Sequence, residues 1–171
     1  MNMKSKTEFF QLPVETPAGR FVAGYSERGL ASLTFPDATL RPESMTQRIP
    51  AVPQQVEAWH RTTSQALARA LAGKPVEELP PLDLSSGTDF QQRVWNVLRK
   101  ISCGETRSYT EVAREIGRPE AVRAVGGACG ANPIPVLVPC HRVLAANKKL
   151  GGFGGGLDWK RTLLAREGVS L

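Results

Sequence analysis

Residues 134–142 have the sequence IPVLVPCHR, an apolar run that ends in Pro139-Cys140-His141-Arg142. Pro139 has a fixed φ and no N–H, and it restricts Val138, so the chain should turn sharply and hold the cysteine in one pose. A free thiol has a pKa of about 8.5, so a nucleophilic cysteine needs a base or a positive field nearby. His141 and Arg142 follow at once. This stretch therefore predicts a nucleophile in a rigid turn, around which the rest of the chain is organised.

The same cysteine also has a structural interpretation. Free cysteine is among the most buried residue types and usually packs as a small hydrophobe. Against this, one of only two histidines in the chain is adjacent to the thiol, and Asn132-Pro133 lies just upstream. Because neighbours in sequence need not touch, the residues alone leave both interpretations open.

Length and composition favour a soluble protein in a reducing compartment, which we expect to be the cytoplasm. The chain has 171 residues, 41% of them hydrophobic, enough for one domain of ordinary size or two small ones. Its three cysteines, Cys103, Cys129 and Cys140, have no C-x-x-C spacing, and His60 lies far from His141. Neither a disulfide framework nor a zinc site is expected. The sequence shows no signal-peptide core and no run long enough to span a bilayer.

The net charge of +6 comes entirely from the second half of the chain. Residues 1–88 hold 9 basic and 9 acidic side chains, whereas residues 89–171 hold 13 and 7. A one-sided basic surplus with a pI near 9.6 suggests a polyanionic partner, most simply nucleic acid. The surplus lies in the half that contains Cys140.

The first half is expected to form a small antiparallel sheet with a helix lying on it. Short apolar segments separated by turn sequences predict strands at 10–15, 21–25 and 30–35. Residues 36–50, with three prolines, predict a loop. A helical apolar period predicts a helix over 52–71, which Gly73 and Pro75 end. Residues 77–86 predict either a linker or an extended segment that lies along the surface of the domain, and this half shows no catalytic constellation.

The second half is expected to be helical. Thr88 is a typical N-cap and predicts a helix that ends at Cys103-Gly104, and Ser108 predicts a second helix over 109–116. A last amphipathic helix is expected over 157–167.

A third helix, over 119–128, follows after a short turn at Gly117, as in a helix-turn-helix. It consists mainly of small residues, and Gly126 and Gly127 each cost a helix roughly 1 kcal/mol relative to alanine. Such a slender helix can lie close to a neighbouring protein helix or to the wall of a DNA groove, and both alternatives stay open. Arg123 alone projects from its smooth face.

The glycine-rich stretch Gly151-Gly152-Phe153-Gly154-Gly155-Gly156 is not a phosphate loop, since no Lys-Ser/Thr pair follows it. It predicts a backbone-exposing loop beside a ligand, with Phe153 available for stacking. The segment before it, 143–150, predicts a turn with exposed lysines. Glu167 lies near a helix C-terminus, where the helix dipole disfavours an acid, so we expect it to have a partner.

Together these residues resemble the O6-alkylguanine-DNA alkyltransferases, the methylated-DNA–protein-cysteine methyltransferases. The resemblance spans about residues 88–168. Its markers are Ser108-Tyr109, Arg123-Ala124-Val125-Gly126-Gly127, Asn132-Pro133, Pro139-Cys140-His141-Arg142, the glycine loop and Glu167-Gly168. It implies an α+β fold: a ribonuclease H-like antiparallel sheet with a helix over 1–87, then a helical DNA-binding alkyltransferase domain with the helix-turn-helix over 88–171.

The resemblance implies direct reversal of DNA alkylation without a cofactor, a metal or turnover. The damaged base is rotated out of the duplex, and Cys140 takes the alkyl group from O6-alkylguanine, and from O4-alkylthymine, in an SN2 step. The implied partner is double-stranded DNA that contains the lesion, bound by a monomer away from any membrane. The thioether that forms is inert, so each molecule acts once.

The resemblance also implies a role for each site residue. The catalytic set is Cys140, His141, Glu167, Asn132 and Tyr109. The DNA-binding set is Arg123, Tyr109, Thr110, Arg118, Ala124 and Gly126. The substrate pocket is lined by Pro135, Cys129, Phe153, Gly154 and Gly155. In this scheme His141 takes the thiol proton through a water and is supported by Glu167, while Asn132 holds the turn. Arg123 fills the gap left by the base, and Tyr109 crowds the 3′ phosphate and hydrogen-bonds the flipped guanine.

Three other functions share part of this sequence pattern. A non-catalytic lesion binder of the same fold would lack the cysteine, which is present here. A cysteine hydrolase that uses Cys140 and His141 would turn over repeatedly, and the sequence offers no clear oxyanion hole. A helix-turn-helix regulator would need a dimerisation segment, and none is found in the sequence.

Overall fold

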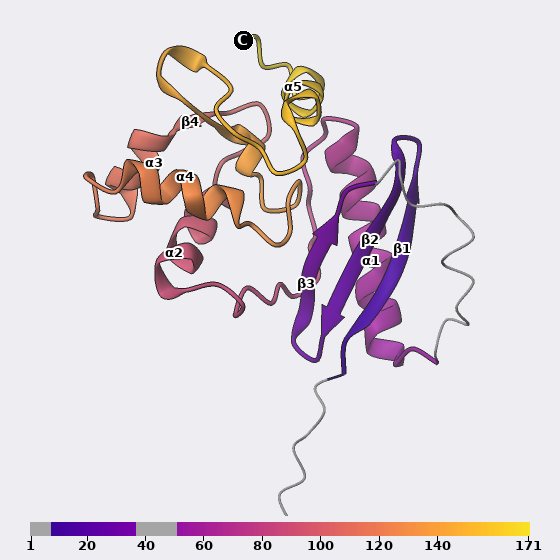
Figure 1. Ribbon diagram of the computed structural model, residues 1–171. Helices are drawn as coiled ribbons and strands as arrows, with labels where there is room; N and C mark the ends of the chain where they lie inside the picture. The colour runs from indigo at the N-terminus through magenta and orange to yellow at the C-terminus, as the bar shows by residue number, and fades with distance from the viewer. Residues whose placement is uncertain (1–7, 37–50) are drawn as a thin grey trace, which may run out of the picture.

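The computed structural model describes residues 8–36 and 51–171 and shows an α+β fold (Figure 1). An antiparallel sheet is formed by β1 (Phe10–Thr16), β2 (Gly19–Ser26) and β3 (Gly29–Thr34). Leu12 pairs with Ala23, and Ala23 pairs with Leu33, so these buried side chains share one apolar face. The predicted meander is confirmed. Of the loop predicted over 36–50, all but Pro36 lies outside the described residues.

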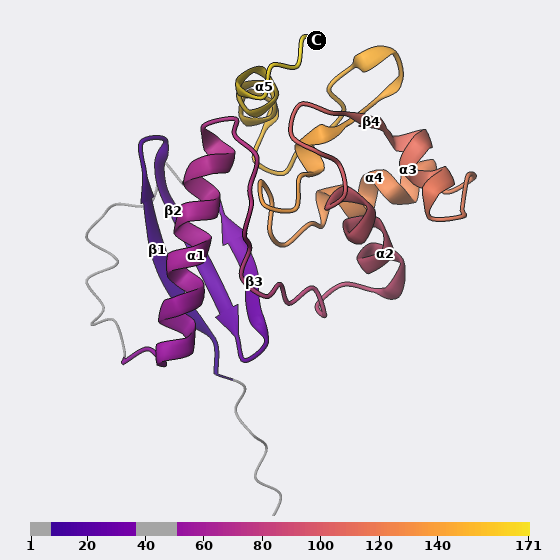
Figure 2. The same ribbon diagram turned by 180° about the vertical axis from the view of Figure 1, so that it is seen from behind.

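A long helix, α1 (Gln54–Leu71), covers one face of the sheet, as both views show (Figures 1 and 2). Tyr25 of β2 is fully buried beneath it, with its hydroxyl 3.0 Å from Nδ1 of His60. The chain then runs back along β3, where Leu30 donates to the carbonyl of Pro81 and accepts from the amide of Asp83, both over 2.8 Å. The extended conformation predicted for this segment is therefore confirmed, and the segment covers part of the outer edge of β3. Its role as a linker between domains stays a prediction.

The second group of elements begins with α2 (Asp89–Leu98). Thr88 and Gln91 form a reciprocal capping box, as the N-cap prediction requires. The helix ends at Leu98, before the predicted end at Cys103-Gly104, because the chain enters turns there. Trp95 Nε1 donates to the carbonyl of Ala128 over 2.8 Å, which fastens α2 to the helix that follows Gly117.

Helices α3 (Tyr109–Glu115) and α4 (Val122–Gly130) pack against each other and against α2. Gly117 has φ +75°, and the amide of Arg118 bonds back to the carbonyl of Ala113, so α3 ends in a Schellman turn. The prediction that α4 begins at Pro119 was wrong. Residues 119–120 form a turn between the end of α3 and Val122, where α4 begins. The identification of α3 and α4 as a helix-turn-helix stays a prediction.

The chain returns through β5 (Val143–Leu144), which pairs in parallel with β4 (Arg107–Ser108). The turn predicted over 143–150 was therefore wrong at its first two residues, which are buried in this short sheet. Helix α5 (Leu157–Arg166) follows with Leu163 and Leu164 buried, as predicted. The ribonuclease H-like label and the domain boundary between 87 and 88 stay predictions. Within 8–36 and 51–171, no helix has both the length and the apolar character that a bilayer crossing requires.

Candidate active site

The predicted sharp turn before Cys140 is an inverse γ-turn. Pro139 has φ −81° and ψ 65°, and the amide of Cys140 donates to the carbonyl of Val138 over 2.8 Å. Cys140–Arg142 then form one 3-10 turn. Upstream, Val136 has φ 74°, a left-handed conformation that β-branched residues avoid, so backbone strain is stored beside the cysteine. The backbone that carries the thiol is therefore tightly constrained.

Asn132 fixes this turn from inside. Its Nδ2 donates to the carbonyl of Val138 over 2.7 Å and to the sulfur of Cys140 over 3.1 Å, and its Oδ1 accepts from the amide of Ile134 over 3.0 Å. One side chain therefore binds both ends of the turn and also touches the sulfur. A donor directed at sulfur stabilises the thiolate relative to the thiol.

His141, Arg142 and Glu167 form a buried charged cluster behind the cysteine. Oε1 of Glu167 lies 2.8 Å from Nε2 of His141 and 2.9 Å from Nη2 of Arg142, while Oε2 accepts from Nε of Arg142 over 3.0 Å. The carboxylate is 1% exposed. Arg142 also donates to the carbonyl of Ile101 over 2.6 Å. The partner expected for Glu167 is thus present, and the pairing is bidentate.

The cluster determines which nitrogen of His141 is free to accept a proton. Burial opposes ionisation of Glu167, but hydrogen bonds from His141 and Arg142 outweigh it and lower its pKa to about 2. An ionised carboxylate only accepts, so Nε2 of His141 carries the hydrogen. Burial also lowers the pKa of His141, which favours the neutral ring. Nδ1 is then a bare acceptor, and among the described residues it is the buried side-chain nitrogen without a hydrogen-bond partner.

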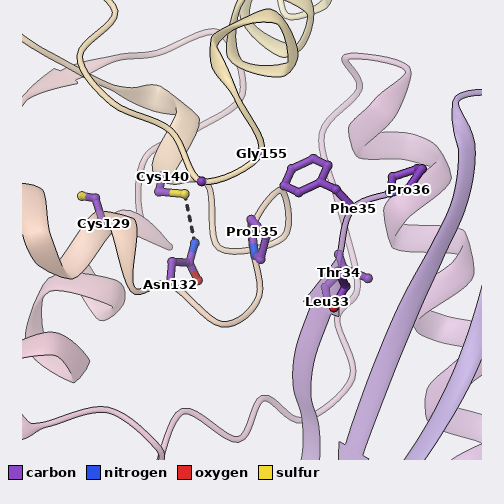
Figure 3. A pocket seen from close by; sticks show the side chains of 11 residues that line it. Leu33, Thr34, Phe35, Pro36, Cys129, Asn132, Pro135, Cys140 and Gly155 are labelled. Atoms are coloured by element: carbon purple, nitrogen blue, oxygen red, sulfur yellow. Dashed lines mark hydrogen bonds between the residues drawn. The ribbon is translucent and has the colours of Figure 1, made fainter. Parts of the chain in front are cut away.

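Cys140 is buried at 5% exposure, yet it lines two cavities. One, of about 450 Å³, is bounded by Tyr109, Gly126 and Phe153. The other, of about 480 Å³, lies between the sulfur and the end of β3 (Figure 3). Pockets of roughly 300–1,000 Å³ hold small-molecule ligands. The sulfur is therefore enclosed but reachable, as a nucleophile requires and a purely structural cysteine does not.

Lys160 provides the positive charge at this site, and the sequence prediction missed it. The side chain is fully buried, and Nζ donates to the carbonyls of Val143 over 2.7 Å and Gly152 over 3.2 Å. Burial raises the pKa of Cys140, while the hydrogen bond from Asn132 and the charge of Lys160 act in the opposite direction. Arg142, the expected source of the field, faces Glu167 instead. The signal in the sequence was the position of Lys160, which precedes buried leucines at helical spacing on α5.

Comparison with known proteins identifies the family. The family described as "6-O-methylguanine DNA methyltransferase, DNA binding domain" matches residues 89–169. A methylated-DNA–protein-cysteine methyltransferase of Mycolicibacterium paratuberculosis is 44% identical over 156 residues, which cover 90% of this chain and 89% of that protein. The chain belongs to the methylated-DNA–protein-cysteine methyltransferases. A methyltransferase of the same name from Methanosarcina acetivorans is 41% identical, over 90% of this chain and 95% of that protein.

A solved methyltransferase structure agrees with the fold as well. The crystal structure of Mycobacterium tuberculosis OGT in complex with DNA is 41% identical and superposes with a TM-score of 0.73, covering 93% of this chain and 91% of that one. The resemblance inferred from the sequence is confirmed over both halves of the chain, although its sequence markers lay only in the second half.

In this methyltransferase the three glycines of α4 are not required for internal packing. A Cβ added at Gly127 or Gly130 would meet no atom within 4 Å, and one at Gly126 would just reach the ring of Tyr109 at 4.0 Å. Arg123, Ala124, Gly127 and Gly130 are exposed. The alternative that these glycines serve a neighbouring protein helix therefore finds no support here, and the bare face of α4 is available to an external partner.

The rest of the predicted DNA-binding set lies on α3 and the turn that follows it. Tyr109 and Thr110 begin α3 and are half-buried, and burial raises the pKa of Tyr109 to about 12, so its hydroxyl stays protonated. Arg118 is exposed but pairs with Glu120 over 2.9 Å, so DNA must compete with that carboxylate for it. The structure thus brings Tyr109 to the cavity and leaves Arg118 at the periphery.

The predicted pocket residues of this methyltransferase are divided between the two cavities. Cys129 and Gly154 line both, Phe153 lines the one beside Tyr109, and Pro135 and Gly155 line the other. Burial raises the pKa of Cys129 to about 12, so this second thiol stays protonated and does not compete with the first.

The remaining thiol, that of Cys103, has a structural contact. It donates to the carbonyl of Gly73 over 3.4 Å, consistent with the structural role expected for it. Within the described part of the chain, no group of three or more His, Cys, Asp or Glu side chains could hold a metal ion.

Proposed function

We propose that this methyltransferase repairs DNA by direct reversal, moving the alkyl group of O6-alkylguanine, and of O4-alkylthymine, irreversibly onto Cys140. The observation that carries the proposal is the position of the sulfur. The sulfur lines a cavity that is also bounded by Tyr109 and by Gly126 of α4. A base rotated out of a duplex that lies along α4 can enter this cavity and reach the thiol.

His141 makes the thiol nucleophilic at neutral pH. Because burial keeps Cys140 protonated, the proton has to leave as the sulfur attacks, and Nδ1 of His141 is the bare acceptor behind it. The transfer passes through a water between the two residues. The imidazolium that forms is stabilised by Glu167 at 2.8 Å, in the manner of an orienting carboxylate behind a histidine base.

The alkyl transfer is a single displacement. The sulfur forms a bond to the alkyl carbon, the bond from that carbon to O6 breaks, and its electron pair stays on the guanine. The protonated hydroxyl of Tyr109 donates a hydrogen bond to the departing base, which stabilises the charge that develops on it. The charge of Lys160 favours the thiolate form of Cys140 until the displacement is complete. A thioether has no good leaving group, so the protein is consumed.

DNA is held by the exposed face of α4. Its small residues let the helix approach the wall of the groove closely, and Arg123 occupies the space that the extruded base leaves in the stack. The basic surplus of residues 89–171 neutralises phosphates and releases counterions, so affinity should fall steeply as salt rises. We place this activity in the cytoplasm, because a single-use thiol has to be kept reduced.

The decisive experiment is intact-mass spectrometry after incubation with a duplex that contains one O6-methylguanine. One added methylene on Cys140, in a ratio of one per protein molecule, is the expected result. Cys140→Ser should abolish the adduct while DNA binding stays nearly intact. Arg123→Ala should slow transfer on duplex DNA and spare the reaction of the thiol with a small alkylating reagent.

The intact mass, together with a turnover assay on ester and amide substrates, separates the other functions. A lesion binder would retain the duplex without gaining mass, and a hydrolase would show repeated turnover of an ester or amide without a stable adduct. Either result would contradict the proposal.

A further inference from the structure

A basic turn follows β5 at residues 145–150, which have the sequence AANKKL. No acidic residue occurs anywhere between Val143 and Gly156. We propose that this turn is a second DNA contact, in which Lys148 and Lys149 bind the phosphates that flank the extruded nucleotide. This inference rests on the proposed alkyl transfer from an extruded base, and it extends the DNA-binding surface beyond α4.

The turn lies beside the cavity that receives the base. Ser108 of β4 pairs in parallel with Leu144 of β5, so the chain that leaves β5 runs alongside the start of α3. After the turn, Gly151 approaches Tyr109 so closely that an added Cβ would lie 2.8 Å from the tyrosine hydroxyl. Gly152 is then part of the cavity lining. Figures 1 and 2 show the turn projecting past β4, on the side of the molecule away from the three-stranded sheet.

The cavity has walls from two different parts of the chain. Tyr109 and Gly126 belong to α3 and α4, whereas Gly152 and Phe153 belong to the glycine loop. A base that enters between these walls stays linked through its sugar to two phosphates, which remain at the rim because a charge is not buried without a partner. The wall of α3 and α4 provides Arg123 at this rim. The glycine loop has no basic side chain of its own, so the two lysines just before it are the cations available on that wall.

The backbone of the turn indicates that the lysine at its tip has a function. Asn147 has φ 58° and ψ 33°, and Lys148 has φ 59°. The amide of Lys149 donates to the carbonyl of Ala146 over 3.3 Å, which closes a type I′ turn. Such turns favour the pair Asn-Gly, because both central residues need a positive φ. Lysine is strained at the second of these positions, where glycine would fit freely, and strain of this kind is typical of functional sites.

Both lysines are free to bind an anion. Their side chains are exposed, and neither takes part in an ion pair with another of the described residues. Other cations near the cavity are already engaged: Arg118 pairs with Glu120, and buried Lys160 donates to two carbonyls. A lysine ammonium is a compact charge on a flexible stem, so it can follow a phosphate that moves as the base is extruded.

The test measures duplex affinity by fluorescence anisotropy over a series of salt concentrations, in a Cys140→Ser background that leaves the lesion unreacted. One duplex contains O6-methylguanine, and the other is unmodified. Lys148→Gly removes the charge and suits the turn, so its thermal midpoint should not fall. On the lesion duplex, the slope of log K against log salt should become shallower by about 0.9 for Lys148→Gly, by about 0.9 for Lys149→Ala and by about 1.8 for both together. On the unmodified duplex these slopes should change little.

A second measurement, with Cys140 intact, relates the contact to repair. Methyl transfer from the lesion duplex at physiological salt should slow several-fold in Lys148→Gly and Lys149→Ala. The rate at which iodoacetamide modifies Cys140 should stay unchanged, because the lysines act on DNA and not on the thiol. Lys148→Arg keeps the charge and should keep both the salt slope and the transfer rate. Lys74→Ala, at an exposed position of the N-terminal half, is the matched control and should alter neither.

The outcomes separate this inference from the function on which it rests. If the wild type gains no methyl adduct, the proposed alkyl transfer fails, whatever the slopes. If the adduct forms and the lysine variants keep the wild-type slope on the lesion duplex, the repair function stands and the second contact is overturned. An equal loss of slope on both duplexes would also overturn it, because the lysines would then bind DNA without regard to the extruded nucleotide.

Discussion

Oε1 of Glu167 lies 2.8 Å from Nε2 of His141, although the two residues are 26 positions apart in the chain. The same oxygen accepts a hydrogen bond from Arg142 over 2.9 Å. One carboxylate therefore orients the imidazole ring and neutralises the positive charge of the guanidinium group. Because His141 and Arg142 directly follow Cys140, their contacts with Glu167 at the end of α5 also hold the turn that carries Cys140 in place. The base that we propose and the stability of the C-terminal half therefore depend on the same carboxylate.

Glu167→Ala should destabilise the protein by about 3–5 kcal/mol, the usual cost of removing one partner of a buried ion pair. Arg142 and His141 would keep their buried positions without an acceptor. Urea unfolding followed by circular dichroism measures the loss. Glu77→Ala breaks an exposed pair with Arg69 and should change stability by less than about 1 kcal/mol. Similar losses in the two variants would refute the view that burial makes this cluster important.

Acid should weaken the folded state in two pH windows. Burial lowers the pKa of His141 below its unfolded value of about 6.5, so below that pH the unfolded chain binds more protons and stability declines. Burial opposes ionisation of Glu167, but its hydrogen bonds hold its pKa near 2. The contribution of Glu167 is complete above its unfolded pKa of about 4.3 and is lost as pH falls from there toward 2.

Urea unfolding at pH values between about 7 and 3 tests both windows. His141→Gln should reduce the decline that begins near pH 6.5, where His60, whose pKa burial also lowers, contributes the rest. The decline below about pH 4.3 should persist in that variant. A single transition that His141→Gln leaves unchanged would show that other groups control the acid response.

Gly127→Ala should make the protein more stable and bind DNA more weakly. Alanine is favoured over glycine in a helix by roughly 1 kcal/mol, and the new Cβ would meet no atom of the protein within 4 Å. The same methyl group lies on the exposed face of α4 that we place against DNA. Thermal unfolding and fluorescence anisotropy with a labelled duplex measure the two effects. An unchanged affinity would show that DNA does not contact this face of α4.

Lys160→Met should make Cys140 less reactive. The charge of Lys160 opposes the rise that burial imposes on the pKa of the thiol, so its loss should raise that pKa further and lower the thiolate fraction. The rate at which iodoacetamide modifies Cys140 should fall several-fold at neutral pH and recover as pH rises. Lys74→Met, at an exposed position, is the control. A slower reaction at every pH to the same degree would indicate a packing defect and not a lost charge.

The sequence predicted what depends on neighbouring residues. The proline before Cys140 predicted the turn, Thr88 and Ser108 predicted their helix starts, and short apolar segments between turn sequences predicted the three strands. These features follow from backbone dihedrals and hydrogen bonds within a few positions, which the local sequence specifies. Glu167 was expected to have a partner for the same reason, because an acid at a helix C-terminus is unfavourable by itself.

Only the tertiary structure decided which distant residues meet. It placed Glu167 beside His141, Lys160 near enough to Cys140 for its charge to lower the pKa of the thiol, and the end of β3 beside the active-site turn, and it started α4 later than Pro119 suggested. None of these contacts has a local signature, because each follows from how helices and sheet pack to bury apolar surface. Residue types near Cys140 could therefore be identified from the sequence, but the source of its positive field and the walls of its cavities depended on packing.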